Sequence, residues 1–392
     1  MQKSKRNIFR LAIFSIFASS IFLAGCNKKE VANEIVIGEY GSMTGGTATF
    51  GQSSHKGIAM AVEAINQGGG LLGKKIRLVT EDDQGKPEEA QTVVTKLINK
   101  DRVSAILGEI ASSNSLAGAP VCQSNRIPMV SPGSTNPKVT EQGDFIFRVC
   151  FIDPFQGQVM AKFATNTLKL KNVAILRDIK SDYSVGLANF FTEAFTKTGG
   201  TIASDESYTQ GDKDFTAQLT SIKAKNPDGI FVPGYYTEVG LIARQARKLG
   251  ITVTLLGGDG WDSSKLWEIG GDALNGCYYS NHYSVDDPSE VLQKFVKDYK
   301  TKFGQTADSI PDAMAALGYD AMLVLADAMK RANSINSDSV RMALATTKGF
   351  VGVTGTITLD EKRNAVKPAV VLEVKVDEKG NGKTVFKESV AP

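Results

Sequence analysis

From Glu34 onward, short β-branched and aliphatic runs alternate with longer segments of helical periodicity. Parallel strands are joined by crossovers that are usually helices, so this alternation predicts parallel sheets covered by helices on both faces. A first set of strands is predicted at residues 35–38, 75–79, 103–107, 128–130 and 145–149. The helices between them are predicted at about 51–66, 87–100 and 113–124.

The pattern restarts with strands at 173–176, 201–204, 229–232 and 252–256, between helices near 154–169, 182–198, 214–226 and 237–249. Two such sets predict an α/β fold of two doubly wound lobes. The mostly helical region 288–347 is expected to complete the first lobe, and the β-rich tail 355–386 to pair with the second. These connections make a hinge that the chain crosses several times. The expected lobes are 34–150 plus 283–353 and 151–282 plus 354–392.

Residues 1–25 have the pattern of a bacterial export signal. A basic start precedes an apolar run, Leu11–Leu23, which is short for a membrane span. The run ends in Leu23-Ala24-Gly25-Cys26, which resembles the lipoprotein signal, where the cysteine is lipidated. An ordinary secretory leader or an uncleaved anchor are the alternatives. We expect signal cleavage before Cys26, a polar tether over 26–33, and an extracytoplasmic protein held at the membrane by lipid.

Composition excludes several classes of function. Beyond the leader, 41 basic residues face 42 acidic ones, so nothing indicates a nucleic-acid partner. The chain has only two histidines, His55 and His282, and four cysteines, too few for an evident zinc site. Gly68–Gly73 follows a predicted helix and precedes a strand, the reverse of a dinucleotide-binding loop. The sequence predicts no catalytic residue, metal or cofactor.

Three cysteines follow the leader, and each lies in an apolar context. Cys122, Cys150 and Cys277 are interpreted as buried hydrophobic residues. A Cys150–Cys277 disulfide is the alternative.

Polar loops follow the third and fourth predicted strands. In open α/β sheets, ligands bind at the carboxyl ends of strands, where helix N-termini present backbone donors. Ser112 and Ser113 follow the third strand, and Gly133, Ser134 and Thr135 follow the fourth. Helix capping explains one such loop, but two adjacent loops favour an anion site suited to a carboxylate.

The second lobe offers an acid and aromatic side chains at its strand ends. Tyr183, Tyr235, Asp259 and Trp261 each follow a predicted strand, and glycines flank Asp259. A turn role for Asp259 and a packing role for Tyr235 are the alternatives. Together the two lobes complement an α-amino acid zwitterion with an apolar side chain.

At these residues the chain resembles the periplasmic leucine/isoleucine/valine-binding proteins of ABC importers, which have the type I periplasmic-binding fold. The resemblance covers essentially the whole mature chain. Its most specific segments are Gly41–Gly45 with Phe50-Gly51, Ala111–Ser113, Ser131–Thr135, Gly234–Glu238 with Arg244–Ala246, and Gly257–Gly260.

The resemblance implies a role for each candidate residue. Ser112, Gly133 and Thr135 would contact the ligand's carboxylate and ammonium, Tyr183 and Tyr235 would contact it from the second lobe, Asp259 would pair with the ammonium, and Phe50 would cover it. Two departures stand out. Gly85 and Ala111 occupy the family's first-lobe disulfide positions, so that bridge is absent, and Trp261 is expected to reshape the side-chain pocket.

The sequence therefore predicts a monomeric, non-enzymatic binding protein that delivers an apolar amino acid to the permease subunits of an ABC importer. A sensor of the same fold, a related small carboxylate or amide as ligand, and an enzyme using the same cleft are the alternatives.

Replacing Cys26 tests the lipid anchor. Because lipidation needs the cysteine thiol, Cys26→Ala should move the protein from the membrane to the soluble fraction. Fractionation followed by immunoblotting measures the distribution. A variant that stays in the membrane with its leader uncleaved would show that the leader is a transmembrane anchor.

Overall fold

The computed structural model describes residues 34–304 and 310–392. The expected leader, the tether and Cys26 lie outside these residues. Within the described ranges, no helix is long and apolar enough to cross a membrane.

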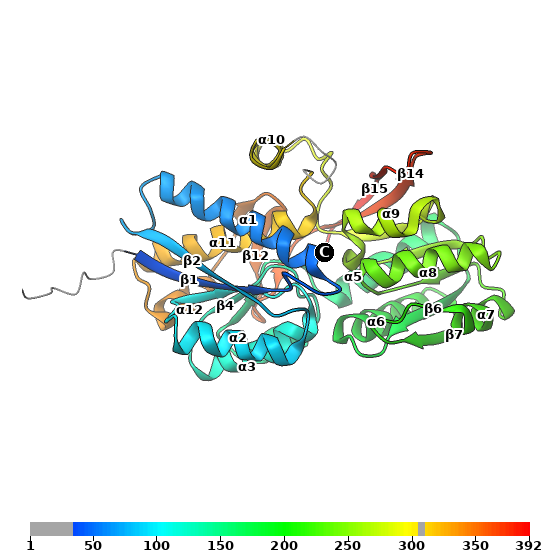
Figure 1. Ribbon diagram of the computed structural model, residues 1–392, viewed down its shortest axis with the longest axis horizontal. Coiled ribbons are helices and arrows are strands. Elements are labelled where there is room, and N and C mark those ends of the chain that lie inside the picture. The colour runs from blue at the N-terminus through cyan, green and yellow to red at the C-terminus, as the bar shows by residue number, and fades with distance from the viewer. Residues whose placement is uncertain (1–33, 305–309) are drawn as a thin grey trace, which may run out of the picture. The chain divides into compact units, whose positions relative to one another are not determined.

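The first lobe is built on a five-stranded parallel sheet in the order β2-β1-β3-β4-β5 (Figure 1). Most side chains of its central strands are buried and apolar, as expected for a sheet that is covered on both faces. The strands are β1 (Glu34–Gly41), β2 (Lys75–Asp82), β3 (Ala105–Leu107), β4 (Met129–Ser131) and β5 (Ile146–Arg148).

Helices cover both faces of this sheet. α1 (Ala48–Gln67) packs with α11 (Ala313–Ala332) over one face, and α2 (Pro87–Asn99) packs with α3 (Ser112–Ser124) over the other. α12 (Ser337–Ala345) contacts α11, and α4 (Lys138–Glu141) contacts α3. Each face has its own cluster of buried apolar residues, so the strand ends between the helix layers are held rigidly.

The second lobe contains a seven-stranded mixed sheet in the order β15-β14-β10-β9-β8-β6-β7. β14 pairs antiparallel with both β10 and β15, and the pairs among β10, β9, β8, β6 and β7 are parallel. The strands are β6 (Asn172–Asp178), β7 (Thr201–Tyr208), β8 (Gly229–Phe231), β9 (Thr254–Gly257), β10 (Tyr278–Asn281), β14 (Ala369–Val376) and β15 (Gly382–Val390). The helices are α5 (Asp153–Lys162), η1 (Phe163–Thr167), α6 (Asp182–Lys197), α7 (Thr216–Ala224), α8 (Tyr236–Lys248), η2 (Asp259–Trp261), α9 (Ser264–Gly270) and η3 (Gly271–Leu274), with α10 (Glu290–Phe303) following β10.

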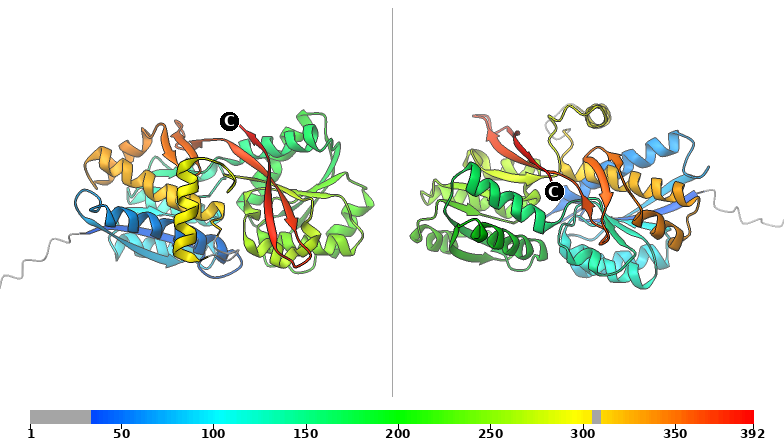
Figure 2. Two further views of the ribbon diagram at one scale, coloured as in Figure 1. Left: turned by 90° about the horizontal axis from the view of Figure 1, so that it is seen from above. Right: turned by 180° about the vertical axis from the view of Figure 1, so that it is seen from behind.

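The chain passes between the two sheets after β5, after β10 and after β13 (Ala365–Val366). In Figure 2 the orange segment that contains α12 lies with the first lobe, whereas the red β14–β15 hairpin lies along the second. Several crossings are what the sequence predicts for this fold.

The expectation that the tail from residue 355 pairs with the second lobe is wrong for its first strands. β12 (Gly355–Leu359) pairs with β11 (Phe350–Gly352) and β13 in a separate three-stranded sheet. The reason is a buried anchor on α11: the Asp320 carboxylate accepts hydrogen bonds from the backbone amides of Val353 (2.8 Å) and Thr354 (2.9 Å). This ties the β11–β12 turn to the first lobe, and only the strands after β13 join the second sheet.

Cys122, Cys150 and Cys277 are buried and unpaired, so the interpretation as hydrophobic core residues is confirmed and the alternative disulfide is wrong.

Close contact between α1 and α11 depends on a glycine. A Cβ atom at Gly57 would lie 1.9 Å from the Ala315 carbonyl oxygen, closer than any real contact allows. Gly57→Ala should therefore force the helices apart and lower the free energy of unfolding by about 1–3 kcal/mol, the usual cost of overpacking. Urea unfolding monitored by circular dichroism measures the change. Ala64→Ser adds one atom at an exposed position of the same helix and serves as the control, for which we expect no change; equal stability of the two variants would contradict the packing account.

Candidate functional site

A small cavity lies where strand ends of both lobes meet. About 190 Å³ of space that atoms do not fill, part of it open to solvent, lies between its lining residues. The lining residues follow β3, β4, β6, β8 and β9 or belong to α1 and α11, so the cavity lies where open α/β sheets bind ligands. They are Phe50, Ile110, Gly133, Thr135, Tyr183, Tyr235, Asp259, Gly260 and Met314.

A serine network shapes the first-lobe side of the cavity. The Ser131 and Ser134 hydroxyls both donate to the Glu109 carbonyl, at 2.7 and 2.8 Å. Ser134 also shares a 2.7 Å hydrogen bond with the Ser115 hydroxyl on α3. These bonds join the loop after β3 to the loop after β4, which fixes Ile110, Gly133 and Thr135 against the cavity. Ser134, a predicted ligand contact, thus has protein partners and does not line the cavity.

Ser112 and Ser113 also have partners in the protein and lie outside the cavity lining. The Ser112 hydroxyl accepts from the Asn136 amide (3.2 Å). The Ser113 hydroxyl donates to the Asp182 carboxylate (2.8 Å) and accepts from the Asp182 amide (3.0 Å), so it joins α3 of the first lobe to α6 of the second. Ser113 is placed to hold the lobes together.

Further hydrogen bonds join the lobes on another side of the cavity. The hydroxyls of Thr49 on α1 and Ser263 before α9 lie 2.9 Å apart. The Thr237 hydroxyl donates to the Gly46 carbonyl (2.9 Å). Hydrogen bonds between residues of different lobes can form only when the two lobes lie close together.

Three aromatic side chains wall the cavity. The Tyr183 and Tyr235 rings stack with centroids 5.3 Å apart and planes 5° apart. The edge of Phe50 meets Tyr235 at 5.6 Å, so α1 of the first lobe covers the aromatic pair of the second. The Tyr183 hydroxyl accepts from the Gly260 amide (3.2 Å). Burial raises the pKa of both tyrosines well above the ordinary value, so the phenols are neutral donors at physiological pH.

Two buried polar atoms of the cavity lining lack hydrogen-bond partners among the described residues. One is the Thr135 hydroxyl of the first lobe, which lies near the Asp153 carboxyl without a bond of ordinary geometry. The other is Oδ1 of Asp259 in the second lobe. Buried polar groups are nearly always hydrogen-bonded. Two atoms without a partner in one cavity therefore indicate groups to which a ligand can bind.

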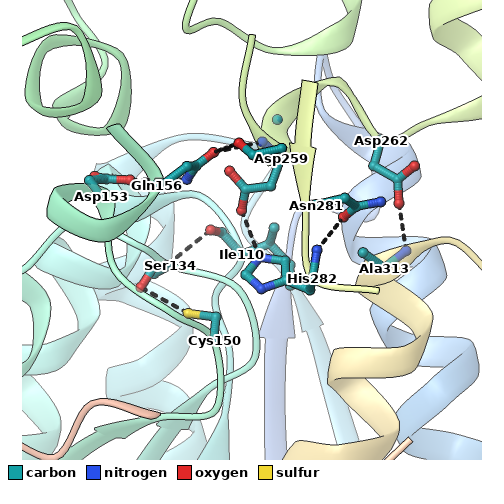
Figure 3. A network of polar contacts seen from close by, with 12 residues as sticks. Ile110, Ser134, Cys150, Asp153, Gln156, Asp259, Asp262, Asn281, His282 and Ala313 are labelled. Atoms are coloured by element: carbon teal, nitrogen blue, oxygen red, sulfur yellow. Dashed lines mark hydrogen bonds and ion pairs between the residues drawn. The ribbon is translucent and has the colours of Figure 1, made fainter. Parts of the chain in front are cut away.

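Asp259 is held at two points, its backbone amide and one carboxylate oxygen (Figure 3). Its backbone amide donates to Oε1 of Gln156 (2.9 Å), which also accepts from the Ser280 hydroxyl (2.9 Å). Oδ2 lies 2.9 Å from Nε2 of His282, which is fully buried. Because the backbone amide and Oδ2 have protein partners, Oδ1 is the atom of Asp259 that is available to a ligand.

Burial also controls the charge of neighbouring groups. It raises the pKa of Asp153 well above the ordinary value, which favours the uncharged form of that carboxyl beside Thr135. Burial lowers the pKa of His282, so its imidazole is neutral. An uncharged Asp153 does not repel an anion at Thr135.

Trp261 is not where the sequence suggested. The side chain is fully buried, its indole nitrogen donates to the Val232 carbonyl (2.9 Å), and its ring lies over Gly257. It is absent from the cavity lining. The expectation that Trp261 reshapes the side-chain pocket is therefore wrong, because the one-turn helix η2 directs its side chain into the second-lobe core.

Of the ten predicted ligand residues, six line the cavity: Phe50, Gly133, Thr135, Tyr183, Tyr235 and Asp259. Sequence reasoning missed Ile110, Gly260 and Met314. Ile110 and Gly260 adjoin residues that were singled out, so their place next to a strand end could have revealed them. Met314 lies at the start of α11, far from the strand ends in sequence, and no local pattern marks it.

Comparison with known proteins places this chain in a family. Residues 34–382 match the model of the periplasmic binding protein family, and the chain belongs to that family. The predicted family and the two-lobed α/β fold are thereby confirmed.

Individual relatives agree over nearly the whole described chain. The Leu/Ile/Val-binding protein homolog 3 of Brucella melitensis is 32% identical over 86% of this chain and 90% of its own length. The leucine-binding protein LivK of Thermotoga maritima is 43% identical, with a TM-score of 0.86 over 91% of this chain and 99% of that one. The branched-chain amino acid binding protein LivJ of Streptococcus pneumoniae, solved with isoleucine, is 32% identical, with a TM-score of 0.82 over 90% and 100%.

Replacing Trp261 tests its place in the core. Trp261→Phe removes the indole hydrogen bond and part of the buried ring, so it should lower the free energy of unfolding by about 2–4 kcal/mol. Urea unfolding measures this loss. Tyr278→Phe keeps a ring of similar size on a half-buried residue and is expected to change stability by less; a Trp261→Phe protein as stable as this control would contradict the core assignment.

Proposed function

We propose that this protein is an extracytoplasmic solute-binding protein that captures a free amino acid with an apolar, branched side chain and delivers it to an ABC importer. One observation carries the proposal. A hydroxyl of one lobe and a carboxylate oxygen of the other, both buried and unpaired, line one cavity with aromatic and aliphatic walls.

Each end of an α-amino acid finds a partner in this arrangement. The ammonium must lose water on burial, and a buried charge is costly without a partner, so Oδ1 of Asp259 receives it. The ligand carboxylate faces Thr135 and the backbone around Gly133, near the N-terminus of α3. Phe50, Tyr183 and Tyr235 then surround the side chain, with Ile110 and Met314 as aliphatic neighbours.

Because the two ends of the ligand are held by different lobes, the ligand itself favours closure. The contacts of Ser113 with Asp182 and of Thr49 with Ser263 form together with that closure. The cavity lining contains groups that bind and enclose, and we propose binding without catalysis.

The named relatives support this ligand class. Their names describe binding of leucine, isoleucine and valine or of branched-chain amino acids, and one was solved with isoleucine. Family membership supports a place outside the cytoplasm and transfer to permease subunits. Anchoring through Cys26 and action as a monomer belong to the proposal as well.

A thermal-shift screen of the mature protein against amino acids and related acids tests the ligand class. A ligand that binds only the folded state stabilises it by about 2.7 kcal/mol at 100 times its Kd. We expect leucine, isoleucine or valine to raise the melting temperature. A rise only with carboxylic acids that have no ammonium, or with amides, would replace the amino acid by that class.

Removing the charge of Asp259 tests the ammonium site. Asp259→Asn keeps the shape but leaves the ligand's buried ammonium without its anion, so affinity should fall by roughly 2–5 kcal/mol, the usual loss when one member of a buried charged pair is removed. Isothermal titration calorimetry measures this change. Asp272→Asn removes the same charge from an exposed residue of the second lobe and should bind as the parent does. Unchanged affinity in Asp259→Asn would show that the ammonium is held elsewhere.

A further inference from the structure

His282 is a buried histidine that the sequence alone did not connect with the ligand. It follows β10 directly, where the chain leaves the second sheet. Its side chain is fully buried, and Nε2 lies 2.9 Å from Oδ2 of Asp259. Figure 3 shows the ring directed at the Asp259 carboxyl. A carboxylate can only accept, so Nε2 carries the proton of this hydrogen bond.

The imidazole is also held by a ring from another crossing between the lobes. Phe151 follows β5, where the chain leaves the first sheet, and its ring stacks on His282 with centroids 3.8 Å apart and planes 23° apart. The ring therefore has little freedom to turn. Its position joins two hinge segments to the carboxyl group that faces the cavity.

The surroundings of the other ring nitrogen, Nδ1, indicate which charge state of the imidazole is favoured. Nδ1 is buried and has no hydrogen-bond partner among the described residues. A protonated imidazole would bury an unpaired N–H, whereas the neutral ring leaves only a lone pair unsatisfied.

We propose that His282 is a positioning residue for ligand recognition: its neutral imidazole binds Oδ2 of Asp259, directs Oδ1 into the cavity, and leaves the negative charge of the carboxylate available to the ligand's ammonium. This proposal rests on the proposed function, because it concerns the group that receives the ammonium. His282 would orient Asp259 as an outer hydrogen-bond partner orients a metal-binding side chain.

The charges around the ring set the direction of its pH dependence. Asp259, Asp262 and Lys367 act on His282, and Asp153 and Cys150 lie near Asp259. Burial is the largest influence and lowers the pKa of His282 below 6.5, against the opposing hydrogen bond of Asp259. The ring is therefore neutral at pH 7 and above. Acidification through its pKa adds a positive charge beside the ammonium, so ligand affinity falls as the pH falls.

Two substitutions of His282 separate positioning from packing. His282→Leu fills similar space without a donor and should weaken leucine binding roughly 10- to 100-fold, as loss of an outer partner does in metal sites. His282→Gln can still donate to Asp259 and should stay within about 3-fold of the parent at pH 7.5. His55→Gln is the matched control, because His55 also pairs with a carboxylate (Glu39, 2.8 Å) but is partly exposed on α1. Calorimetry with leucine at pH 7.5 measures all four proteins.

A second ligand shows whether the effect acts on the ammonium. 2-Hydroxy-4-methylpentanoate has the leucine side chain and carboxylate but a hydroxyl in place of the ammonium. A positioning role predicts that His282→Leu weakens leucine binding more than binding of this hydroxy acid. Equal losses for the two ligands would mean that His282 only supports the fold, and would overturn the proposal.

The pH dependence of leucine affinity tests the positioning role of His282 even if the His282→Leu protein does not fold. Affinity of the parent should fall on acidification from pH 7.5 to 5, and His282→Gln should lose less. Asp83 and Asp312, whose pKa values burial raises to about 6 and about 7, remain in both proteins, so the difference between their profiles belongs to His282. Identical profiles would overturn the proposal while leaving the proposed function intact. A parent protein that binds no amino acid would overturn both.

Discussion

The structure depends on a carboxylate that is buried between two lobes. Asp259 is almost fully enclosed, and only one of its two carboxylate oxygens has a partner in the described protein. A charge in this position is costly, because the protein interior cannot replace the water that it loses. In the proposed function, this cost falls when the ammonium of the ligand arrives from solvent and the lobes close over it. Binding energy and closure are thus linked through one side chain.

The two lobes contribute different chemical groups to the cavity. The first lobe is rigid at the site, because serine hydroxyls tie the loops after β3 and β4 to the Glu109 carbonyl. Its contribution to the cavity is the hydroxyl of Thr135, a neutral donor, beside Asp153, whose pKa burial raises. The second lobe contributes the negative charge and stacked phenol rings. Because these different groups lie on opposite lobes, the proposed zwitterionic ligand would satisfy both lobes at once, and a simple acid or amine only one.

The hinge is more than a set of flexible connections. His282 and Phe151 stack where two crossings meet, and Asp320 anchors the β11–β12 turn shortly before the third. Oδ2 of Asp262 in the second lobe accepts from the Ala313 amide at the start of α11 (2.6 Å; Figure 3). Polar groups near the hinge are thus paired with specific partners across the lobes, and these pairs hold the arrangement of the lobes that the structure has. These contacts fix the relative positions of the residues that line the cavity.

Local sequence was sufficient for the fold class and for much of the site. Strand and helix patterns have periods that follow from backbone geometry, and residues at the carboxyl ends of parallel strands converge, so Thr135, Tyr183, Tyr235 and Asp259 could be assigned to one cleft from their positions alone. Tertiary structure decided the rest. The direction of Trp261 follows from one turn of η2, and the pairing of β12 follows from Asp320 on a distant helix. Whether a serine faces a ligand or a neighbouring loop, and which atom His282 holds, depend on contacts between residues far apart in the chain, and no local pattern records such contacts.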